Sequence, residues 1–219
     1  MTCPGCRGDM LRLPVDGKLE RPIQIDLCLT CRLIWFDRYE DLQLAPSGTL
    51  RVFEYISKPG QPSTPLPPAP TCPRCGAPLV MTHDIQRNTR FRYWRCDAEH
   101  GRLMTFVDFL REKDFVRPLT PAEIAQLRQT IKTVNCGNCG GPIDLAKDTV
   151  CSHCGSALSI LDPDQMAQTV AQLKGAPAPG EHAADFGAIV DAMKTAPASD
   201  SRALLDVGLR VLAELLKKR

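Results

Sequence analysis

Cys96-Asp97-Ala98-Glu99-His100 completes the cysteine pattern of this chain, which has 11 cysteines. Ten of them form Cys-x-x-Cys pairs: Cys3 and Cys6, Cys28 and Cys31, Cys72 and Cys75, Cys136 and Cys139, and Cys151 and Cys154. Cys96 is the eleventh, and His100, four residues later, gives it a partner. Six pairs provide enough ligands for three tetrahedral zinc sites with no cysteine left over.

The composition favours small metal-stabilised modules over one large core. Only 5% of the 219 residues are aromatic, and 19 are proline. Modules shorter than about 70–80 residues usually need disulfides or a structural metal to fold. The sequence therefore predicts a small metal-stabilised α+β protein. We expect three zinc-ribbon modules of short β-hairpins and zinc knuckles, a connecting helix and an α-helical C-terminal region.

The N-terminus and the hydropathy pattern predict a cytoplasmic protein. Met1 to Cys6 has no apolar signal-peptide region, and no stretch approaches 18 consecutive apolar residues. Thiols stay reduced in the cytoplasm, so the cysteine pairs there indicate metal or redox chemistry and not disulfides. The formal net charge of +2 falls to about −3 once the thiolates and three Zn²⁺ ions are counted. This is not the strongly basic balance of a dedicated nucleic-acid-binding protein.

Residues 1–56 form the first predicted ribbon, with Cys3, Cys6, Cys28 and Cys31 as zinc ligands. The two knuckles are 21 residues apart, which suits a β-hairpin. Its strands are expected near 11–15 and 23–27, because Asp16-Gly17 is a turn signal and apolar and polar residues alternate after it.

The run from Cys28 to Leu42 resembles the bacterial zinc ribbons that are similar to the ribbon of transcription factor IIB. The residues that match the pattern after the second knuckle are Trp35, Asp37, Glu40 and Leu42. The sequence departs from the pattern at Arg32, where Gly is usual, and at Asp41, which separates the Glu from the Leu. The resemblance covers residues 3–44 and implies a zinc ribbon in a bacterial protein, without implying a role. We expect Trp35 to lie in the ribbon core.

The second ribbon is predicted at 72–133 and includes a helix at 121–133. The start of this helix is marked by the capping box Thr120-Pro121-Ala122-Glu123, with Pro at the first helical position. Its expected ligands are Cys72, Cys75, Cys96 and His100; His83 is an alternative fourth ligand. Residues 57–71, six of which are proline, form a Pro-rich linker that predicts an independently mobile first ribbon. Hairpin strands are expected at 79–85 and 90–95.

Residues 134–161 form the third predicted ribbon, a generic short one. Its expected zinc ligands are Cys136, Cys139, Cys151 and Cys154. Residues 162–219 form the helical C-terminal region, with helices expected from 162 to about 173, at 183–194 and at 201–217. One apolar stripe at helical spacing is formed by Leu204, Leu205, Gly208, Val211, Leu212, Leu215 and Leu216. This stripe packs on the preceding helices or on a second copy, binds another protein, or binds a membrane surface.

The sequence contains no recognisable catalytic constellation, because the cysteines and His100 are assigned to metal. We therefore predict a non-enzymatic zinc-binding adaptor with three structural zinc ions. It would bind a protein partner, or itself, through the amphipathic helices of 183–217. The alternative is a factor of transcription or translation that binds nucleic acid through the basic and aromatic strand 90–95. A rubredoxin-like iron centre with a redox function is a third interpretation.

Overall fold

The computed structural model describes residues 1–57, 69–86, 89–136, 141–153 and 155–175, together with residues 209, 212, 213, 216 and 217. The strands in this part of the chain are β1 (Leu11–Asp16), β2 (Pro22–Cys28), β3 (Leu33–Asp37), β4 (Val80–Gln86), β5 (Thr89–Arg95), β6 (Gly101–Thr105), β7 (Val116–Pro118), β8 (Thr133–Asn135), β9 (Pro142–Asp144) and β10 (Ser159–Leu161). The helices are η1 (Lys18–Glu20), α1 (Glu40–Gln43), α2 (Pro46–Ile56), α3 (Phe106–Glu112), α4 (Pro121–Thr130) and α5 (Pro163–Leu173).

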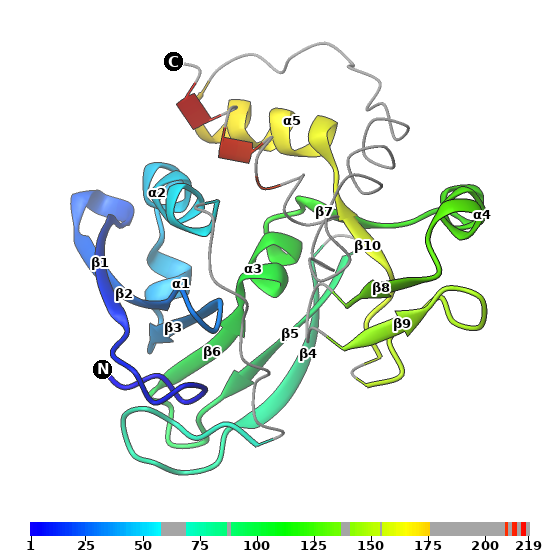
Figure 1. Ribbon diagram of the computed structural model, residues 1–219. Coiled ribbons are helices and arrows are strands. Elements are labelled where there is room, and N and C mark those ends of the chain that lie inside the picture. Colours follow the sequence, from blue (N-terminus) through cyan, green and yellow to red (C-terminus); the bar gives the residue numbers. More distant parts are fainter. Residues whose placement is uncertain are drawn as a thin grey trace.

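The first two predicted ribbons form a single antiparallel sheet of six strands in the order β1-β2-β3-β6-β5-β4 (Figure 1). The hairpins β1–β2 and β4–β5 confirm the strands expected from the sequence. A third strand follows the second knuckle of each ribbon, β3 in the first and β6 in the second. These two strands pair at the centre of the sheet, where Trp35 lies opposite Leu103 and Asp37 opposite Gly101.

The pairing of β3 with β6 corrects the expectation of an independently mobile first ribbon. Proline content in the connecting segment suggested separation, but residues 58–68 of that segment lie outside the described residues. The physical reason for the error lies elsewhere. A strand that follows a knuckle leaves one row of backbone N–H and C=O groups without a partner, and the equivalent strand of the other ribbon satisfies them.

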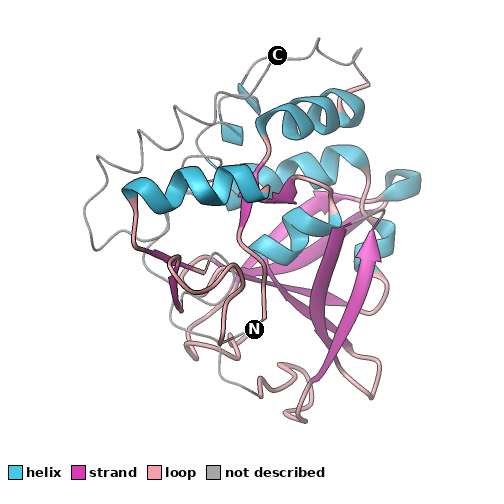
Figure 2. Cartoon of the chain, turned by 90° about the vertical axis from the view of Figure 1, so that its right-hand side faces the viewer, coloured by secondary structure: helices cyan, strands magenta, loops and turns pink. Residues whose placement is uncertain are grey.

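The two faces of the sheet have different partners. On one face, Leu33, Trp35, Trp94 and Leu103 cluster with the buried cysteines of both ribbons. On the other face, Ile34, Phe36 and Met104 belong to a larger cluster with residues of α2, α3 and α5. Figure 2 shows helices gathered on one side of the sheet. Its aromatic centre includes Phe53 and Phe115, whose ring centroids are 4.4 Å apart. Alternate residues of β3 thus serve two cores, as the period of a strand requires.

The predicted third ribbon lies beside a second apolar cluster. Helix α4 begins with the expected capping box, in which the Thr120 hydroxyl accepts from the Glu123 N–H while the Glu123 carboxylate accepts from the Thr120 N–H. Its residues Ile124 and Leu127 pack with residues of β8–β9. The pair β7–β10 then leads into α5, whose N-terminus is capped by the Asp162 carboxylate.

The C-terminal region is described in part. Helix α5 confirms the helix expected up to residue 173, whereas the helix expected at 183–194 lies outside the described residues. From the last expected helix, Leu209 and Leu212 are buried in the cluster that contains Met166 and Val170, and Leu216 packs against it. Leu212 and Leu216 of the apolar stripe therefore pack on the same chain. Within the described residues, the helices are too short or too polar to cross a membrane.

Candidate metal centres

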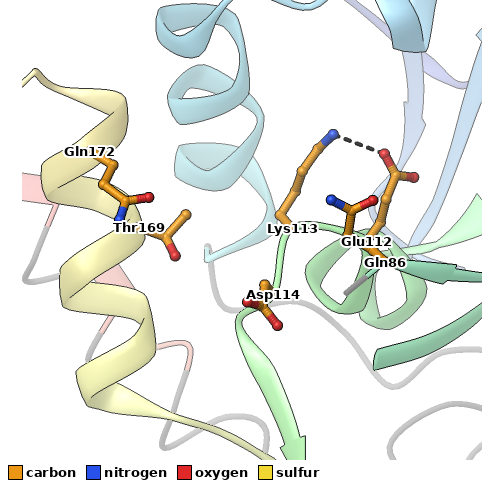
Figure 3. Close-up of a pocket in the computed structure, with 6 residues that line it drawn as sticks. All are labelled: Gln86, Glu112, Lys113, Asp114, Thr169 and Gln172. Atoms are coloured by element: carbon orange, nitrogen blue, oxygen red, sulfur yellow. Dashed lines mark hydrogen bonds and ion pairs between the residues drawn. The ribbon is translucent and has the colours of Figure 1, made fainter. Parts of the chain in front are cut away.

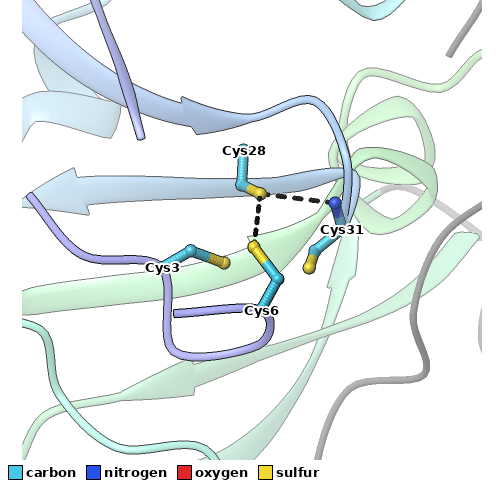
Figure 4. Close-up of side chains that lie close together, drawn as sticks. All are labelled: Cys3, Cys6, Cys28 and Cys31. Atoms are coloured by element: carbon cyan, nitrogen blue, oxygen red, sulfur yellow. Dashed lines mark hydrogen bonds between the residues drawn. The ribbon is translucent and has the colours of Figure 1, made fainter. Parts of the chain in front are cut away.

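The four cysteines of the first ribbon converge at one end of the sheet. Cys3 and Cys6 lie in the loop before β1, Cys28 ends β2 and Cys31 lies in the turn before β3 (Figure 4). All four Sγ atoms lie within 4.8 Å of one another, and those of Cys6 and Cys28 are 3.7 Å apart. Metal–sulfur bonds of about 2.3 Å in a tetrahedron separate two sulfurs by about 3.8 Å. The thiols are therefore spaced as a tetrahedral metal ion requires.

The backbone of each knuckle is shaped around its first cysteine. The Cys3 N–H donates to the Gly8 carbonyl at 2.8 Å, and the Arg7 N–H donates to the Cys3 carbonyl at 3.0 Å. This turn places Arg7 at φ 63°. The Gly5 N–H points to the Cys3 sulfur at 3.3 Å, and the Cys31 N–H points to the Cys28 sulfur at the same distance. These N–H groups stabilise negative charge on sulfur.

The first group of thiols favours a bound cation electrostatically. A hydrogen bond from Cys28 lowers the pKa of Cys3 to about 5, against the effect of burial. The same hydrogen bond and burial raise the pKa of Cys28, and burial raises that of Cys31 to about 12. One thiolate thus makes ionisation of its neighbours unfavourable. A divalent cation offsets this repulsion and holds all four as thiolates.

The second ribbon forms an equivalent group from Cys72, Cys75, Cys96 and His100, whose ligand atoms also lie within 4.8 Å of one another. The Sγ atoms of Cys75 and Cys96 are 3.7 Å apart. The His100 Nδ1 lies 3.5 Å from the Cys96 sulfur, close to the roughly 3.6 Å expected for bonds of about 2.3 Å to sulfur and 2.0–2.1 Å to nitrogen. Burial raises the pKa of the Cys96 thiol, but hydrogen bonds from His100 outweigh this effect and lower it to about 7.

The structure distinguishes the two candidate histidines of the second ribbon. His100 belongs to the ligand group, whereas His83 lies exposed in the middle of β4 and outside that group. Gly101, at φ 149°, follows His100. A Cβ atom added there would lie about 2.0 Å from the Phe36 carbonyl oxygen. Glycine therefore permits the close approach of β6 to β3 directly after the knuckle.

The knuckle backbone repeats between the two ribbons. The Cys72 N–H donates to the Ala77 carbonyl at 2.7 Å, and the Gly76 N–H donates to the Cys72 carbonyl at 2.8 Å. Gly76 has φ 74° at the position that Arg7 occupies in the first ribbon. The Arg74 N–H points to the Cys72 sulfur at 3.4 Å. Both knuckles therefore offer the same cradle to a metal.

A polar link joins the two centres through residues that matched the ribbon pattern. Trp35 is fully buried, which confirms its predicted place in the core, and its indole N–H donates to the Asp37 carboxylate at 2.8 Å. The same carboxylate accepts Nε of Arg74 at 2.9 Å, together with Nη2 of that guanidinium. Arg74 lies between the two cysteines of the second ribbon's first knuckle. Asp37 thus ties a strand of one ribbon to a knuckle of the other.

Further contacts between the two ribbons were not expected from the sequence. Asp41, interpreted as a departure from the family pattern, pairs with Arg102 of β6 at 2.9 Å, and Arg102 also pairs with Glu112. The Arg38 N–H donates to the His100 carbonyl at 3.1 Å, and its guanidinium pairs with Glu99. Ion pairs between distant segments leave no periodicity or spacing in a sequence, so no local signal could have found them.

The third predicted ligand set is described only in part. Cys136 and Cys151 are buried in the cluster beside α4, whereas Cys139 and Cys154 lie outside the described residues. The backbone around the described pair has the knuckle hydrogen bonds. The Cys136 N–H donates to the Gly141 carbonyl at 2.7 Å, and the Cys151 N–H donates to the Ser156 carbonyl at 2.8 Å. His153 is exposed.

The basic and aromatic strand 90–95 turns its rings inward. Phe91 and Trp94 are buried in opposite faces of the sheet, and Tyr93 packs against the larger cluster. The Arg92 guanidinium donates to the Ser156 hydroxyl at 3.3 Å, and Arg95 pairs with Asp97. The strand therefore does not present the stacked aromatic platform that single-stranded nucleic acid uses.

A polar pocket of about 220 Å³ lies between α5 and the turn after α3 (Figure 3). It is lined by Gln86, Glu112, Lys113, Asp114, Thr169 and Gln172. Lys113 pairs with Glu112 at 2.8 Å, and Asp114 accepts from the Gln165 amide at 2.7 Å. Because these charged side chains already have partners within the chain, the pocket is better explained as a solvent-filled gap between helices than as a ligand site.

None of the family models, curated proteins or solved structures compared with this chain matches it. The likeness to the bacterial ribbons therefore depends on the residues of the first ribbon alone. The geometry of the two ligand groups carries the functional argument.

Proposed function

We propose that this protein is a non-enzymatic zinc-binding adaptor in which zinc stabilises three ribbons. The observation that carries this proposal is the closed ligand set of the first two centres, each with four protein ligand atoms within 4.8 Å of one another. Catalytic zinc sites use three protein ligands and keep a position for water or substrate, whereas structural sites use four. A set of four protein ligands at each centre therefore favours a structural ion.

Zinc is the ion that best fits both donor sets. A Cys₄ group suits either zinc or a rubredoxin-like iron, but a Cys₃His group is a common structural zinc set. Both groups adjoin the same apolar cluster, so we assign them the same ion. A third zinc at Cys136, Cys139, Cys151 and Cys154 is supported by the knuckle hydrogen bonds around the two described cysteines. The proposed stoichiometry is three Zn²⁺ ions per chain.

Metal analysis of the purified full-length chain tests this proposal. We expect three zinc ions, a colourless protein and the loss of one ion in His100→Ala. His83→Ala is the matched control and should retain all three. A Cys136→Ser/Cys151→Ser double variant should lose the third ion only. Red protein that contains iron, or a loss of metal in His83→Ala but not in His100→Ala, would contradict the assignment.

The adaptor function is favoured over nucleic-acid binding by the buried rings of Phe91 and Trp94. Its test is native mass spectrometry of the tagged full chain recovered from a nuclease-treated lysate. The zinc-ligand variant Cys28→Ser serves as a control with a disrupted ribbon. A protein partner in fixed stoichiometry, retained by the wild type and lost by the control, is the expected result. Recovery of nucleic acid in untreated samples, with no protein in fixed stoichiometry, would favour nucleic-acid binding over the adaptor function.

A further inference from the structure

The two edges of the six-stranded sheet differ in how they are protected. On the β1 edge, Pro14 has no N–H to donate, and the Asp16 carbonyl already accepts from the Ala45 N–H at 3.0 Å. On the opposite edge, β4 runs for seven residues without proline, lysine or arginine. Within the described part of the chain, β4 pairs with β5 alone. An unprotected edge of this length is a template for pairing with another strand.

The β4 edge also exposes apolar side chains. Met81 and Ile85 are 42% and 56% exposed, and Val80 is 39% exposed. Large apolar side chains in an edge strand normally gain a partner or a cover. The edge therefore combines outward-facing backbone groups with apolar surface, which are the two elements of binding by strand addition.

The hydrogen bonds of the hairpin show which β4 residues point outward. The Ile85 N–H donates to the Asp84 carboxylate at 2.7 Å and so points away from β5. Arg92, which lies opposite His83, directs its N–H to Asp108 on the other side of β5. Because hydrogen-bonded and non-hydrogen-bonded pairs alternate along an antiparallel ladder, Met81, His83 and Ile85 direct their backbone groups to the free edge.

We propose that a second copy of this chain pairs with this edge, antiparallel and centred on His83. In this register each His83 faces its equivalent, and each Met81 faces Ile85 of the second copy. Three outward residues then meet three outward residues. The Ile85 N–H would exchange the Asp84 carboxylate for the Met81 carbonyl of the second copy, and the pairing then gives about six main-chain hydrogen bonds. A two-fold axis through the His83 pair closes the assembly as a dimer with a continuous sheet.

The charge pattern of β4 is compatible with self-pairing and favours this register. Asp84 is the only formal charge on β4, and in the proposed register it faces the Thr82 hydroxyl of the second copy. A shift by two residues in one direction would place the two Asp84 carboxylates opposite each other, which is destabilising. The opposite shift would pair Ile85 with Leu79, which is already buried in its own chain. The strand is thus complementary to itself in one register.

A charge-pair rescue tests the register with the full-length, metal-loaded chain. Sedimentation equilibrium of the wild type over about 1–200 µM should show a reversible dimer. Met81→Lys and Ile85→Glu should each raise the dimer dissociation constant at least about tenfold, because the two-fold axis applies each change twice. The double variant M81K/I85E should restore dimerisation, since each introduced lysine faces an introduced glutamate of the other copy. Within one strand these positions are about 13 Å apart and cannot pair.

Leu19→Lys is the matched control, because Leu19 is 88% exposed in the hairpin beside the other edge. It should dimerise like the wild type. A wild type that stays monomeric throughout would overturn the proposal and leave the edge to a strand of another protein. Single variants with unchanged dimerisation would exclude this edge, and an unrescued double variant would exclude the register. None of these outcomes alters the metal stoichiometry or partner recovery that test the adaptor function.

Discussion

Replacing Asp37 by alanine tests whether the link between the two ribbons stabilises the fold. The substitution removes the acceptor of the Trp35 indole N–H, which lies in a fully buried side chain. A buried donor left without a partner costs about 1–3 kcal/mol. The lost ion pair with Arg74 adds about 0.2–1 kcal/mol, because the two side chains are 42% and 30% exposed. The expected loss is therefore about 2 kcal/mol, or roughly 30-fold in the folding equilibrium.

Urea unfolding at fixed free zinc concentration measures this loss. The chain has two tryptophans, and both are buried in the cluster between the two centres, so their fluorescence reports on this region. Asp37→Asn keeps an acceptor for Trp35 and should lose less than about 1 kcal/mol. Asp97→Ala removes an exposed ion pair with Arg95 and should cost almost nothing. If the free energies of unfolding of Asp37→Ala and Asp97→Ala differ by less than about 0.5 kcal/mol, the link through Asp37 does not stabilise the fold.

Three further substitutions probe other parts of the fold. Leu212→Ala should cost about 2–5 kcal/mol in thermal or urea unfolding, because Leu212 is fully buried; Leu19→Ala is its exposed control. Hydrogen bonds from Arg117 lower the pKa of Glu123 from 4.5 to about 2. The ionised Glu123 carboxylate therefore stabilises the fold fully above pH 4.5, and this stabilisation disappears as the pH falls towards 2. The stability difference between wild type and Glu123→Gln should follow that window, and a constant difference would contradict it. Burial raises the pKa of Glu40 from 4.5 to about 7; protonation therefore favours the folded state, and this contribution is lost as the pH rises through 7. Glu40→Gln should be more stable than the wild type at pH 8 but not at pH 4, as measured by the urea midpoint.

Local sequence signals predicted the local structure well. Cysteine spacing identified the residues that the structure groups as two ligand sets, including His100 in preference to His83. The turn at Asp16-Gly17 and the capping box at Thr120 marked the β1–β2 hairpin and the start of α4. Each of these signals lies within a few residues of the element that it specifies, and turn and cap chemistry acts over that range.

The arrangement of the ribbons could not be predicted in the same way. The strand Leu33–Asp37 is buried on both faces, as a central strand is, but no strand was expected there from the sequence. Its partner strand begins more than 60 residues later in the sequence. Strand pairing over such a separation is decided by which edges remain free after the local hairpins form, and a single sequence does not encode that directly.

The pairing of β3 with β6 lets the two ribbons bury apolar surface that neither ribbon could bury alone. A three-stranded ribbon with two knuckles is too small to bury both of its faces. When β3 pairs with β6, Trp35 and Leu103 meet across the junction and form one core with the cysteines of both centres. The helices then need to cover only the opposite face. Because thiol ligands and apolar side chains belong to the same cluster, loss of one metal ion would expose apolar surface next to the other centre. The two ions should therefore be released together during titration with a chelator, and two separate, independent release steps would show that the shared core does not couple them.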